Sequence, residues 1–202
     1  MNNAMTNSRR NSAAKSDKTR RRILTAAASA FRERGIDGVG LRDIMKRAGM
    51  TRGGFYFHFT DKDSLFNEAT RDAALTSVAT YVSIAESAPE GQKLQAFINF
   101  YLSTEHRDQP EGGCMISVLG GEVGRANLKQ RTAFTNSIGV ILDRIAKYVP
   151  GESEAERRRK AGLLMASMAG VLMVSRVLSD LSRSDALLAA ARAFYSRSFA
   201  GG

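Results

Sequence analysis

Apolar residues recur at helical spacing along most of this 202-residue chain, and this periodicity limits the folds open to it. Ile23, Ala27, Ala30 and Phe31 fall at i, i+4, i+7 and i+8, which places them on one face of a helix. No strand-like alternation with turn pairs persists, and no repeat period is evident. The sequence therefore predicts an all-α fold of about nine helices.

The ends of the first helix are marked by its capping residues. We expect it to begin at one of Ser16, Asp17 or Thr19, whose side chains accept hydrogen bonds from the free N–H groups of a first turn. Gly35 suits the left-handed position after a helix, and Ile36 can fold back as the apolar residue that often follows.

Two short helices come next. The second helix carries apolar residues at helical spacing over 41–48 and ends at Gly49. Thr51 can cap a third helix, in which Phe55 and Phe59 face inward. The sequence thus predicts three small helices before residue 60.

A long helix is predicted over 62–85. The run Thr60-Asp61-Lys62-Asp63 has the pattern of a capping box, with Thr60 reaching forward and Asp63 reaching back. Glycines, prolines and Ser/Asp caps then separate five further helices, which we expect over residues 91–105, 114–123, 126–148, 154–181 and 185–199.

Positive charge is concentrated at the N-terminal end. Residues 1–62 hold 14 Lys/Arg against 5 Asp/Glu, a net of +9, whereas residues 63–202 hold 16 against 15, a net of +1. A basic end on a neutral body is typical of a protein that binds a polyanion, although a solvated basic tail gives the same charge. We expect a disordered basic tail over 1–15, a DNA-binding domain over 16–61 and a helical body over 62–202.

Several classes of protein are disfavoured. The single cysteine excludes an internal disulfide framework and suits a reducing cytoplasm, where we expect the protein to act. The first 22 residues are polar and basic, so they do not form a signal peptide. His58 and His106 are too few to build a metal or nucleophile site, and the glycine-rich stretch 120–124 lacks the Gly-Lys-Ser/Thr ending of a phosphate loop. We therefore expect no enzyme activity, no catalytic residue, no cofactor and no metal.

The second and third helices form a helix-turn-helix pattern around Gly49-Met50-Thr51. In that motif the second helix crosses the DNA backbone, while the third lies in the major groove with its N-terminal residues at base edges. The third helix, over 52–58, holds two glycines that each cost about 1 kcal/mol against alanine. Close approach of backbone N–H groups to phosphate would offset that cost, so the motif predicts double-stranded DNA as the partner.

The stretch from Thr19 to Phe66 resembles the DNA-binding domain of the TetR-like (tetracycline-repressor-type) regulators. The resemblance covers about a quarter of the chain, with every segment in order and at the expected spacing. The matching segments are Arg22-Ile23-Leu24-x-Ala26-Ala27, Phe31-x-x-x-Gly35, Leu41-Arg42-Asp43-Ile44, Ala48-Gly49, Arg52-Gly53-Gly54-Phe55-Tyr56-x-His58-Phe59 and Lys62-Asp63-x-Leu65.

The resemblance implies a homodimer whose subunits each have three small DNA-binding helices and a larger helical body with a ligand pocket. Such proteins repress transcription until a small-molecule effector binds, which releases them from a palindromic operator. Arg42 and Arg52 match positions that touch bases or nearby phosphates, and Gly53 matches a position where the backbone nears the DNA. The positions that hold phosphates are matched by Tyr56, His58 and Lys62.

This chain also departs from the family pattern. Gly40 and Gly54 replace a Ser or Thr, so a hydroxyl contact to phosphate is lost at each. Phe57 replaces a Tyr or Trp and offers only an apolar contact, for instance to a thymine methyl group. Tyr56 and His58 can alternatively cover the small core, and Arg42 can be a plain solvated charge. The residues expected to contact DNA are Arg42, Thr51, Arg52, Gly53, Gly54, Tyr56, Phe57, His58 and Lys62.

The last two predicted helices point to dimerisation. Residues 154–181 are apolar on more than one face, and the final helix carries a matching stripe, so a monomer would leave much of this surface wet. The alternative is that both helices form the core of a monomer. The apolar stretch 161–175 is shorter than the roughly 20 residues needed to cross a bilayer, so we expect no membrane partner.

We expect the effector pocket among the middle helices. Flexible Met and aromatic residues suit an adaptable apolar site, although each is also an ordinary core residue. The helix over 62–85 is predicted to be the only rigid connection from this pocket to the DNA-binding helices. The expected walls of the pocket are Phe97, Phe100, Tyr101, Met115, Phe134 and Met168.

Cys114 carries an alternative hypothesis. It follows two glycines and is predicted to open a helix, where the helix N-terminus stabilises a thiolate. Some regulators of the resembling family with a Gly-Cys at this place respond to electrophiles or oxidants, so a repressor that senses thiol chemistry through Cys114 is one alternative. A small buried hydrophobe is the plain interpretation of the same residue. A non-specific DNA-coating protein, with a specificity ratio near one, is the other alternative function.

Overall fold

The computed structural model describes the backbone of residues 2–199 and the side chains of residues 13–199. Within residues 2–199 the chain forms nine α-helices and one 3₁₀ turn, η1, with no β-strand. The predicted all-α architecture of about nine helices is confirmed. In chain order the elements are α1 (Asn2–Arg34), α2 (Leu41–Arg47), η1 (Arg52–Gly54), α3 (Lys62–Glu86), α4 (Lys93–Tyr101), α5 (Thr104–Asp108), α6 (Met115–Val123), α7 (Leu128–Ile145), α8 (Glu154–Val177) and α9 (Leu181–Phe199).

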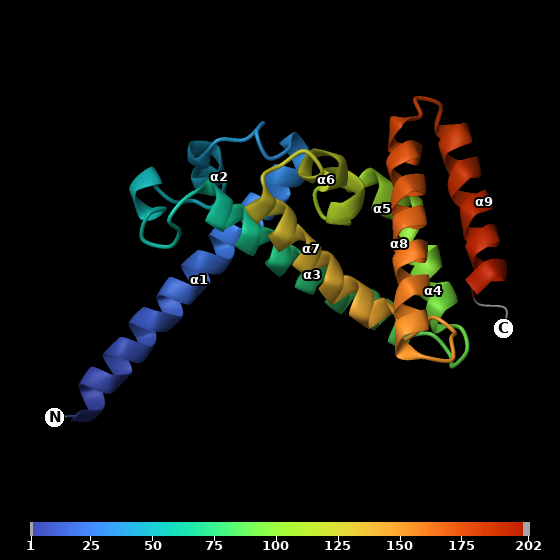
Figure 1. Cartoon of the computed structure of the whole chain (residues 1–202). Helices are drawn as coiled ribbons and strands as arrows, with labels where there is room; N and C mark the ends of the chain where they lie inside the picture. Colours follow the sequence, from blue (N-terminus) through green and yellow to red (C-terminus); the bar gives the residue numbers. More distant parts are fainter. Residues whose placement is uncertain (1, 200–202) are drawn as a thin grey trace.

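A small N-terminal head is joined to a larger body (Figure 1). The head consists of the C-terminal half of α1, α2, η1 and the turn up to residue 61, and the body consists of α3 to α9. In the body α7 runs along α3, while α8 and α9 form an antiparallel pair at the end far from the head. Phe31 of α1 and Phe66 of α3 meet edge to face with ring centroids 5.4 Å apart, so the head and the body share one hydrophobic core.

α1 extends further toward the N-terminus than the sequence analysis predicts. The expected disorder over residues 1–15 is not met at residues 13–15, which lie inside α1; Met1 and the side chains of residues 2–12 lie outside the described part. The predicted caps at Ser16, Asp17 or Thr19 are also wrong, because Thr19 donates its hydroxyl to the Lys15 carbonyl within the helix. No glycine or proline interrupts residues 2–34, so nothing stops the helix there.

α1 ends where the sequence predicts. Gly35 has a φ of 78°, and its N–H donates to the Phe31 carbonyl at 2.8 Å. Ile36 then folds back and is buried. A left-handed glycine therefore turns the chain from α1 toward α2.

α3 begins with a capping box that is one residue later than predicted. The Asp61 carboxylate accepts from the Ser64 N–H at 2.6 Å, and the Asp61 N–H donates to the Ser64 hydroxyl at 3.2 Å. Because the helix starts at Lys62, Asp61 is its N-cap and Ser64 its third residue, so Thr60 and Asp63 are not the pair. The end at Glu86 lies one residue beyond the predicted one.

The body helices follow the predicted order with shifted ends. The helix predicted over 91–105 is two helices, α4 and α5, because the chain breaks after Tyr101 and the Ser103 hydroxyl caps α5 by accepting from the His106 N–H. α7 begins at Leu128, capped by Asn127, and α9 begins four residues earlier than predicted. Serine and asparagine caps thus set several of these boundaries.

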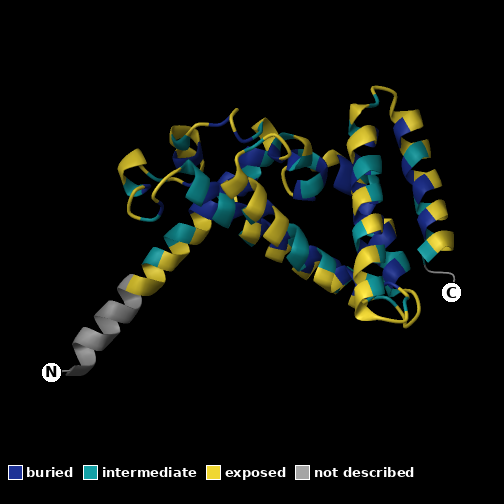
Figure 2. Cartoon of the chain, in the orientation of Figure 1, coloured by how far each residue is buried: buried dark blue, intermediate teal, exposed yellow. Residues whose placement is uncertain are grey.

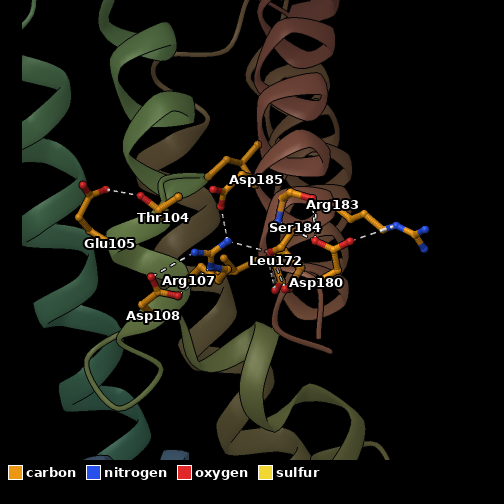
Figure 3. Close-up of polar contacts among 12 residues, drawn as sticks. Thr104, Glu105, Arg107, Asp108, Leu172, Asp180, Arg183, Ser184 and Asp185 are labelled. Atoms are coloured by element: carbon orange, nitrogen blue, oxygen red, sulfur yellow. Dashed lines mark hydrogen bonds and ion pairs between the residues drawn. The ribbon is translucent and has the colours of Figure 1, made fainter. Parts of the chain in front are cut away.

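A polar cluster around Arg107 joins α5 to the N-terminal part of α9 (Figure 3). The Arg107 guanidinium is buried and donates to the Ser184 hydroxyl at 2.8 Å and to the Asp185 and Asp108 carboxylates at 2.5 and 2.7 Å. The hydrogen bond to Asp108, with a smaller contribution from Asp185, raises the pKa of Arg107 above its ordinary value. Ser184 in turn donates to the Ser175 carbonyl of α8, so the cluster fixes α9 against the rest of the body.

Figure 2 shows exposed residues along both α8 and α9, and several of these are large and apolar. By length and composition, the whole of α8 could cross a bilayer. The stretch 161–175, on which the sequence-based prediction rests, is by itself too short. Another side of α8 carries Leu164, Met168 and Leu172 into the core of the body. The exposed apolar residues of the pair are Leu163, Met173, Val174, Val177, Leu181 and Phe194.

Candidate functional site

The turn between α2 and η1 is held from inside the head. Ile44, Met45 and Ala48 are buried, as their spacing predicts. Gly49 has a φ of 65°, a conformation that a side chain rarely adopts, and an added Cβ would lie 2.8 Å from the Arg22 guanidinium. Arg22 itself donates to the Ala48 carbonyl at 2.7 Å and so closes the C-terminus of α2. These contacts fix the direction in which the next segment leaves α2.

The predicted third helix over 52–58 is not a regular α-helix. It is the single 3₁₀ turn η1, followed by turns, with hydrogen bonds from Gly54 N–H to the Thr51 carbonyl and from Phe55 N–H to the Arg52 carbonyl. Thr51 is the N-cap residue, but its side chain makes no capping bond. Two adjacent glycines and the missing capping bond both disfavour an α-helix at this place.

Two aromatic anchors hold this segment against the head. Phe55 and Phe59 are buried, as predicted, and their rings stack with centroids 5.7 Å apart. Arg20 of α1 lies over the Phe59 ring at 4.8 Å and pairs with Glu68 of α3. The segment between the anchors therefore has a fixed base, although little of it is regular helix.

The nine residues predicted to contact DNA come from α2, from the segment around η1 and from the first residue of α3, and we call them together the recognition surface. Six of them are exposed and three are half-buried. The structure brings Arg42 of α2 together with Thr51 and Arg52 in one shallow depression, which Lys46 also lines. The exposed six are Arg42, Thr51, Arg52, Gly53, Tyr56 and Phe57, and the half-buried three are Gly54, His58 and Lys62.

The aromatic residues of the recognition surface point outward. Phe57 is 86% exposed and Tyr56 is 62% exposed, so neither serves as core. Tyr56 touches Phe55 edge to face and keeps most of its ring in solvent. His58 lies between the rings of Phe57 and Phe59, with centroids 5.8 and 6.4 Å away, and it partly covers the small core. Exposed aromatic rings on a basic surface are suited to contact a nucleic acid.

Sequence reasoning missed a second part of the basic surface. Lys18, Arg21 and Arg22 of α1 and Arg47 of α2 line one open hollow beside the recognition surface. The i, i+3, i+4 spacing of the three α1 residues was the signal that would have found it. Arg47 donates to Glu33 at 2.6 Å, and this hydrogen bond lowers the pKa of the Glu33 carboxyl to about 2.

Two polar contacts tie the head to the body besides α3. The Glu122 carboxylate of α6 accepts from the Ile36 N–H at 2.7 Å and from the Asp37 N–H at 3.2 Å, in the loop after α1. Lys129 of α7 pairs with the exposed Asp61 carboxylate at 3.9 Å. The prediction that α3 is the only rigid connection is therefore wrong, because α6 and α7 also hold the head.

The residues expected to line an effector pocket are mostly core. Phe97, Tyr101, Met115, Phe134 and Met168 are all buried. Phe100 is half-buried and lines a cleft formed by α1, α3, α4 and α5. Their apolar character is thus accounted for by packing of the body.

Cys114 caps α6 but has no exposed surface. Its backbone N–H donates to Nε2 of His106 at 3.1 Å. Tyr81 and Tyr101 lie beside it; burial, with a smaller contribution from the nearby thiol, raises the pKa of both phenols well above their ordinary value. A buried thiol among phenols matches the plain interpretation of Cys114 as a small hydrophobe. Among residues 13–199, no three His, Cys, Asp or Glu side chains gather to form a metal site.

Comparison with known proteins agrees with this arrangement. Residues 23–69, which contain the recognition surface, match the family model described as "Bacterial regulatory proteins, tetR family". Over 180 residues the chain is 26% identical to the "A-factor receptor protein" of Streptomyces griseus; the match covers 85% of this chain and 59% of that relative's length. Over 50 residues it is 46% identical to the "HTH-type transcriptional regulator AcrR" of Shigella flexneri, covering 25% of this chain and 23% of AcrR.

Solved structures extend the likeness from the head to the whole fold. The reduced form of E. coli NemR superposes with a TM-score of 0.75 at 19% identity, covering 90% of this chain and 97% of that one. At this identity the superposition shows a common fold and no more. The helices of the head and of the body are thus arranged as in that protein.

Proposed function

Because this chain is a member of the tetR family of bacterial regulatory proteins, we propose that it is a transcriptional repressor that leaves a palindromic operator when a small molecule binds its body. The observation that carries the proposal is the recognition surface, an exposed basic and aromatic segment fixed by the buried Phe55 and Phe59. A structural role in the protomer gives no reason for Phe57 to be 86% exposed. The protein would act in the cytoplasm, where its operator lies.

The recognition surface suggests a division of roles. Arg42 and Arg52, which share one depression, would reach base edges or adjacent phosphates in the major groove. Phe57 would contact a thymine methyl group, and the backbone at Gly53 would approach the DNA closely. The remaining contacts, to phosphate oxygens, would come from Thr51, Gly54, Tyr56, His58 and Lys62.

A homodimer would place two recognition surfaces on one operator. The exposed apolar side of the α8–α9 pair supports dimerisation, since a second copy would cover it. Half-sites on a palindrome lie about 34–36 Å apart, or a multiple of that, from centre to centre. A ligand that binds more tightly to a dimer with a different distance between its recognition surfaces would therefore reduce DNA affinity. The reduction is set by the ratio of the ligand's affinities for the two arrangements. The receptor name of the relative from Streptomyces griseus supports a small-molecule effector.

The test is a footprint of the purified protein on the DNA upstream of its own gene, followed by titration against that site and against random DNA of equal length. We expect one protected palindrome and an affinity at least about 1,000-fold above that for random DNA. A ratio near one would instead identify a DNA-coating protein.

A further inference from the structure

A cleft of about 170 Å³ lies where the head meets the body. α1 contributes Arg32, α3 contributes Ser77 and Tyr81, and the ends of α4 and α5 contribute Phe100 and His106. The cleft is separate from the recognition surface and involves only one of the expected pocket residues, Phe100. It joins helices of both parts of the molecule, so a molecule bound there would touch head and body together.

Arg32 brings into the cleft a positive charge that forms no ion pair within 4.0 Å among the described residues. Its guanidinium is half-buried, and its Nε donates to the Glu111 backbone carbonyl at 2.6 Å. Among residues 13–199 no carboxylate lies within 4.0 Å of it, and Nη1 and Nη2 have no hydrogen-bond acceptor. Burial lowers the pKa of Arg32 from its ordinary value, which marks the cost of holding the charge there. An anion with two oxygens would satisfy the two free nitrogens of the fork.

Tyr81 supplies a second donor at the same end of the cleft. Its side chain is 2% exposed, and its buried hydroxyl has no hydrogen-bond partner among the described residues. Burial raises the pKa of the Tyr81 phenol, so it stays protonated and can donate, and the Ser77 hydroxyl and the Cys114 thiol lie near it without meeting the geometry of a hydrogen bond. Ser77 lies one turn before Tyr81 on α3 and brings another hydroxyl to the same wall. Buried donors without acceptors are unfavourable unless a ligand or water meets them.

Two stacked rings give part of the cleft a flat surface. The rings of Phe100 and His106 stack with centroids 5.8 Å apart and an interplanar angle of 12°. Burial lowers the pKa of His106, and its two nitrogens already meet the Tyr101 carbonyl at 2.6 Å and the Cys114 N–H at 3.1 Å. His106 therefore adds ring surface but no charge. This wall accepts the hydrocarbon part of a small molecule.

The remaining charge in the cleft is distant from the fork. Asp72 also lines the cleft, nine residues before Tyr81 on α3, which is about 14 Å along a helix. The side chain of Glu111, which belongs to the loop before α6, is exposed. Neither carboxylate forms an ion pair with Arg32, although Glu111 lies near enough to stabilise its charge through space.

We propose that this cleft binds a small monocarboxylic acid, with its carboxylate on Arg32 and the Tyr81 hydroxyl and its hydrocarbon part against Phe100. The small volume excludes long acyl chains. The proposal rests on the proposed function only in naming such an acid as the effector. Bound between α1 and the loop that leads into α6, the acid would act on α1 itself and on α6, whose Glu122 carboxylate holds the loop after α1.

The experiment is isothermal titration calorimetry of the full chain with acetate, butyrate and benzoate, and with benzamide as the uncharged match of benzoate. We expect saturable binding of at least one acid at one site per subunit, and at least about tenfold weaker binding of benzamide than of benzoate. Absence of saturable binding by all three acids would overturn the proposal, as would equal binding of benzamide and benzoate.

Variants locate the site. Arg32→Met keeps the side-chain stem and removes the fork, so we expect acid binding to weaken by at least about tenfold. Tyr81→Phe removes only the hydroxyl and should weaken binding severalfold without loss of folding. Arg192→Met is the matched control, because Arg192 is also half-buried and donates to a backbone carbonyl, that of Leu102 at 2.6 Å, outside the cleft. Unchanged acid binding in both Arg32→Met and Tyr81→Phe would assign Arg32 to anchoring the loop at Glu111 only.

A DNA titration of the same proteins separates the two proposals. Loss of operator affinity on adding the acid, abolished by Arg32→Met, identifies the acid as the effector. If the acid binds but operator affinity is unchanged, the cleft is a binding site for the acid but the acid is not the effector. Acid binding by a protein without operator preference contradicts the proposed function alone.

Discussion

Arg52 and Lys62 are both basic and both belong to the recognition surface, yet their surroundings differ. Arg52 is exposed at the start of η1 and shares a depression with Arg42. Lys62 is half-buried as the first residue of α3, directly after the capping carboxylate of Asp61. A planar fork on an exposed turn suits guanine, whereas a point charge at a helix start suits a phosphate.

Replacing each of the two residues should therefore change DNA binding in a different way. We expect Arg52→Ala to cost about 1–3 kcal/mol on the preferred operator and to relax the choice of particular base pairs. Lys62→Ala should weaken binding to all sequences about equally and reduce the salt slope by about one unit per subunit. Binding titrations of both variants against operator and random DNA at several salt concentrations measure this.

Equal losses on operator and random DNA for Arg52→Ala would make Arg52 a backbone clamp. Base reading would then fall to Arg42, Phe57 and the backbone at Gly53 and Gly54.

The surroundings of Cys114 predict that its thiol reacts slowly with alkylating reagents. Because its side chain has no exposed surface, iodoacetamide should alkylate it at least about tenfold more slowly in the folded protein at neutral pH than in the urea-unfolded chain. The chain has one cysteine, so mass spectrometry of the whole protein reports this residue alone. Faster alkylation in the folded protein, with release of DNA that Cys114→Ser abolishes, would instead support the thiol-sensing alternative.

At the scale of elements, the exposed side of α8 has the spacing of a helix–helix seam. Leu163, Gly170 and Val177 are seven residues apart, and Met173 and Val174 lie between the last two. An added Cβ at Gly170 meets nothing within 4 Å inside the protomer. A larger side chain there would consequently disturb a partner copy and not its own subunit.

Gly170→Leu tests this. We expect sedimentation to show a dimer at micromolar concentration for the parent chain, and a dissociation constant at least about tenfold higher for the variant, because overpacking a seam costs about 1–3 kcal/mol. DNA affinity should fall with it. Gly121→Leu on α6 is the matched control, since Gly121 is also helical and also has open space around its Cβ. Equal dimerisation of both variants would remove Gly170 from the interface.

The same elements show what a sequence can predict. The apolar periodicity and Gly35 and Gly49 located α2, α3 and the end of α1 to within a residue or two, because local backbone and burial requirements determine them. The prediction of a third α-helix was wrong, because adjacent glycines weaken an α-helix. The buried Phe55 and Phe59 hold the segment in place although it is not an α-helix. The predicted start of α1 was wrong because no glycine or proline marks it in the sequence.

At the scale of the whole molecule, the packing of the head on the body and of α5 on α9 depends on contacts that no local pattern reveals. Glu122 is 86 residues from Ile36, and Arg107 is 78 residues from Asp185. Each partner taken alone is an ordinary charged or backbone group. The cleft at Arg32 was missed for the same reason, because its walls come from helices distant in the chain.

The Glu122 contact predicts a measurable coupling. Glu122→Ala removes the acceptor of the Ile36 N–H, so we expect the Ile36 amide to exchange its hydrogen about tenfold faster, as loss of one such bond allows. Glu90→Ala, at an exposed glutamate of the body, is the control and should leave that exchange unchanged. If Ile36 exchanges at the parent rate in Glu122→Ala, the loop after α1 is held by the head alone.

The two glycines of the recognition surface have a further consequence for how such a protein can change over time. An added Cβ at Gly53 meets nothing within 4 Å, at Gly54 it meets only ordinary contacts, and neither residue has a positive φ. The subunit itself therefore tolerates many residues at both positions, and folding does not restrict them. Selection there would act almost entirely through the DNA partner, which makes this pair a route by which operator preference can diverge while the scaffold stays intact.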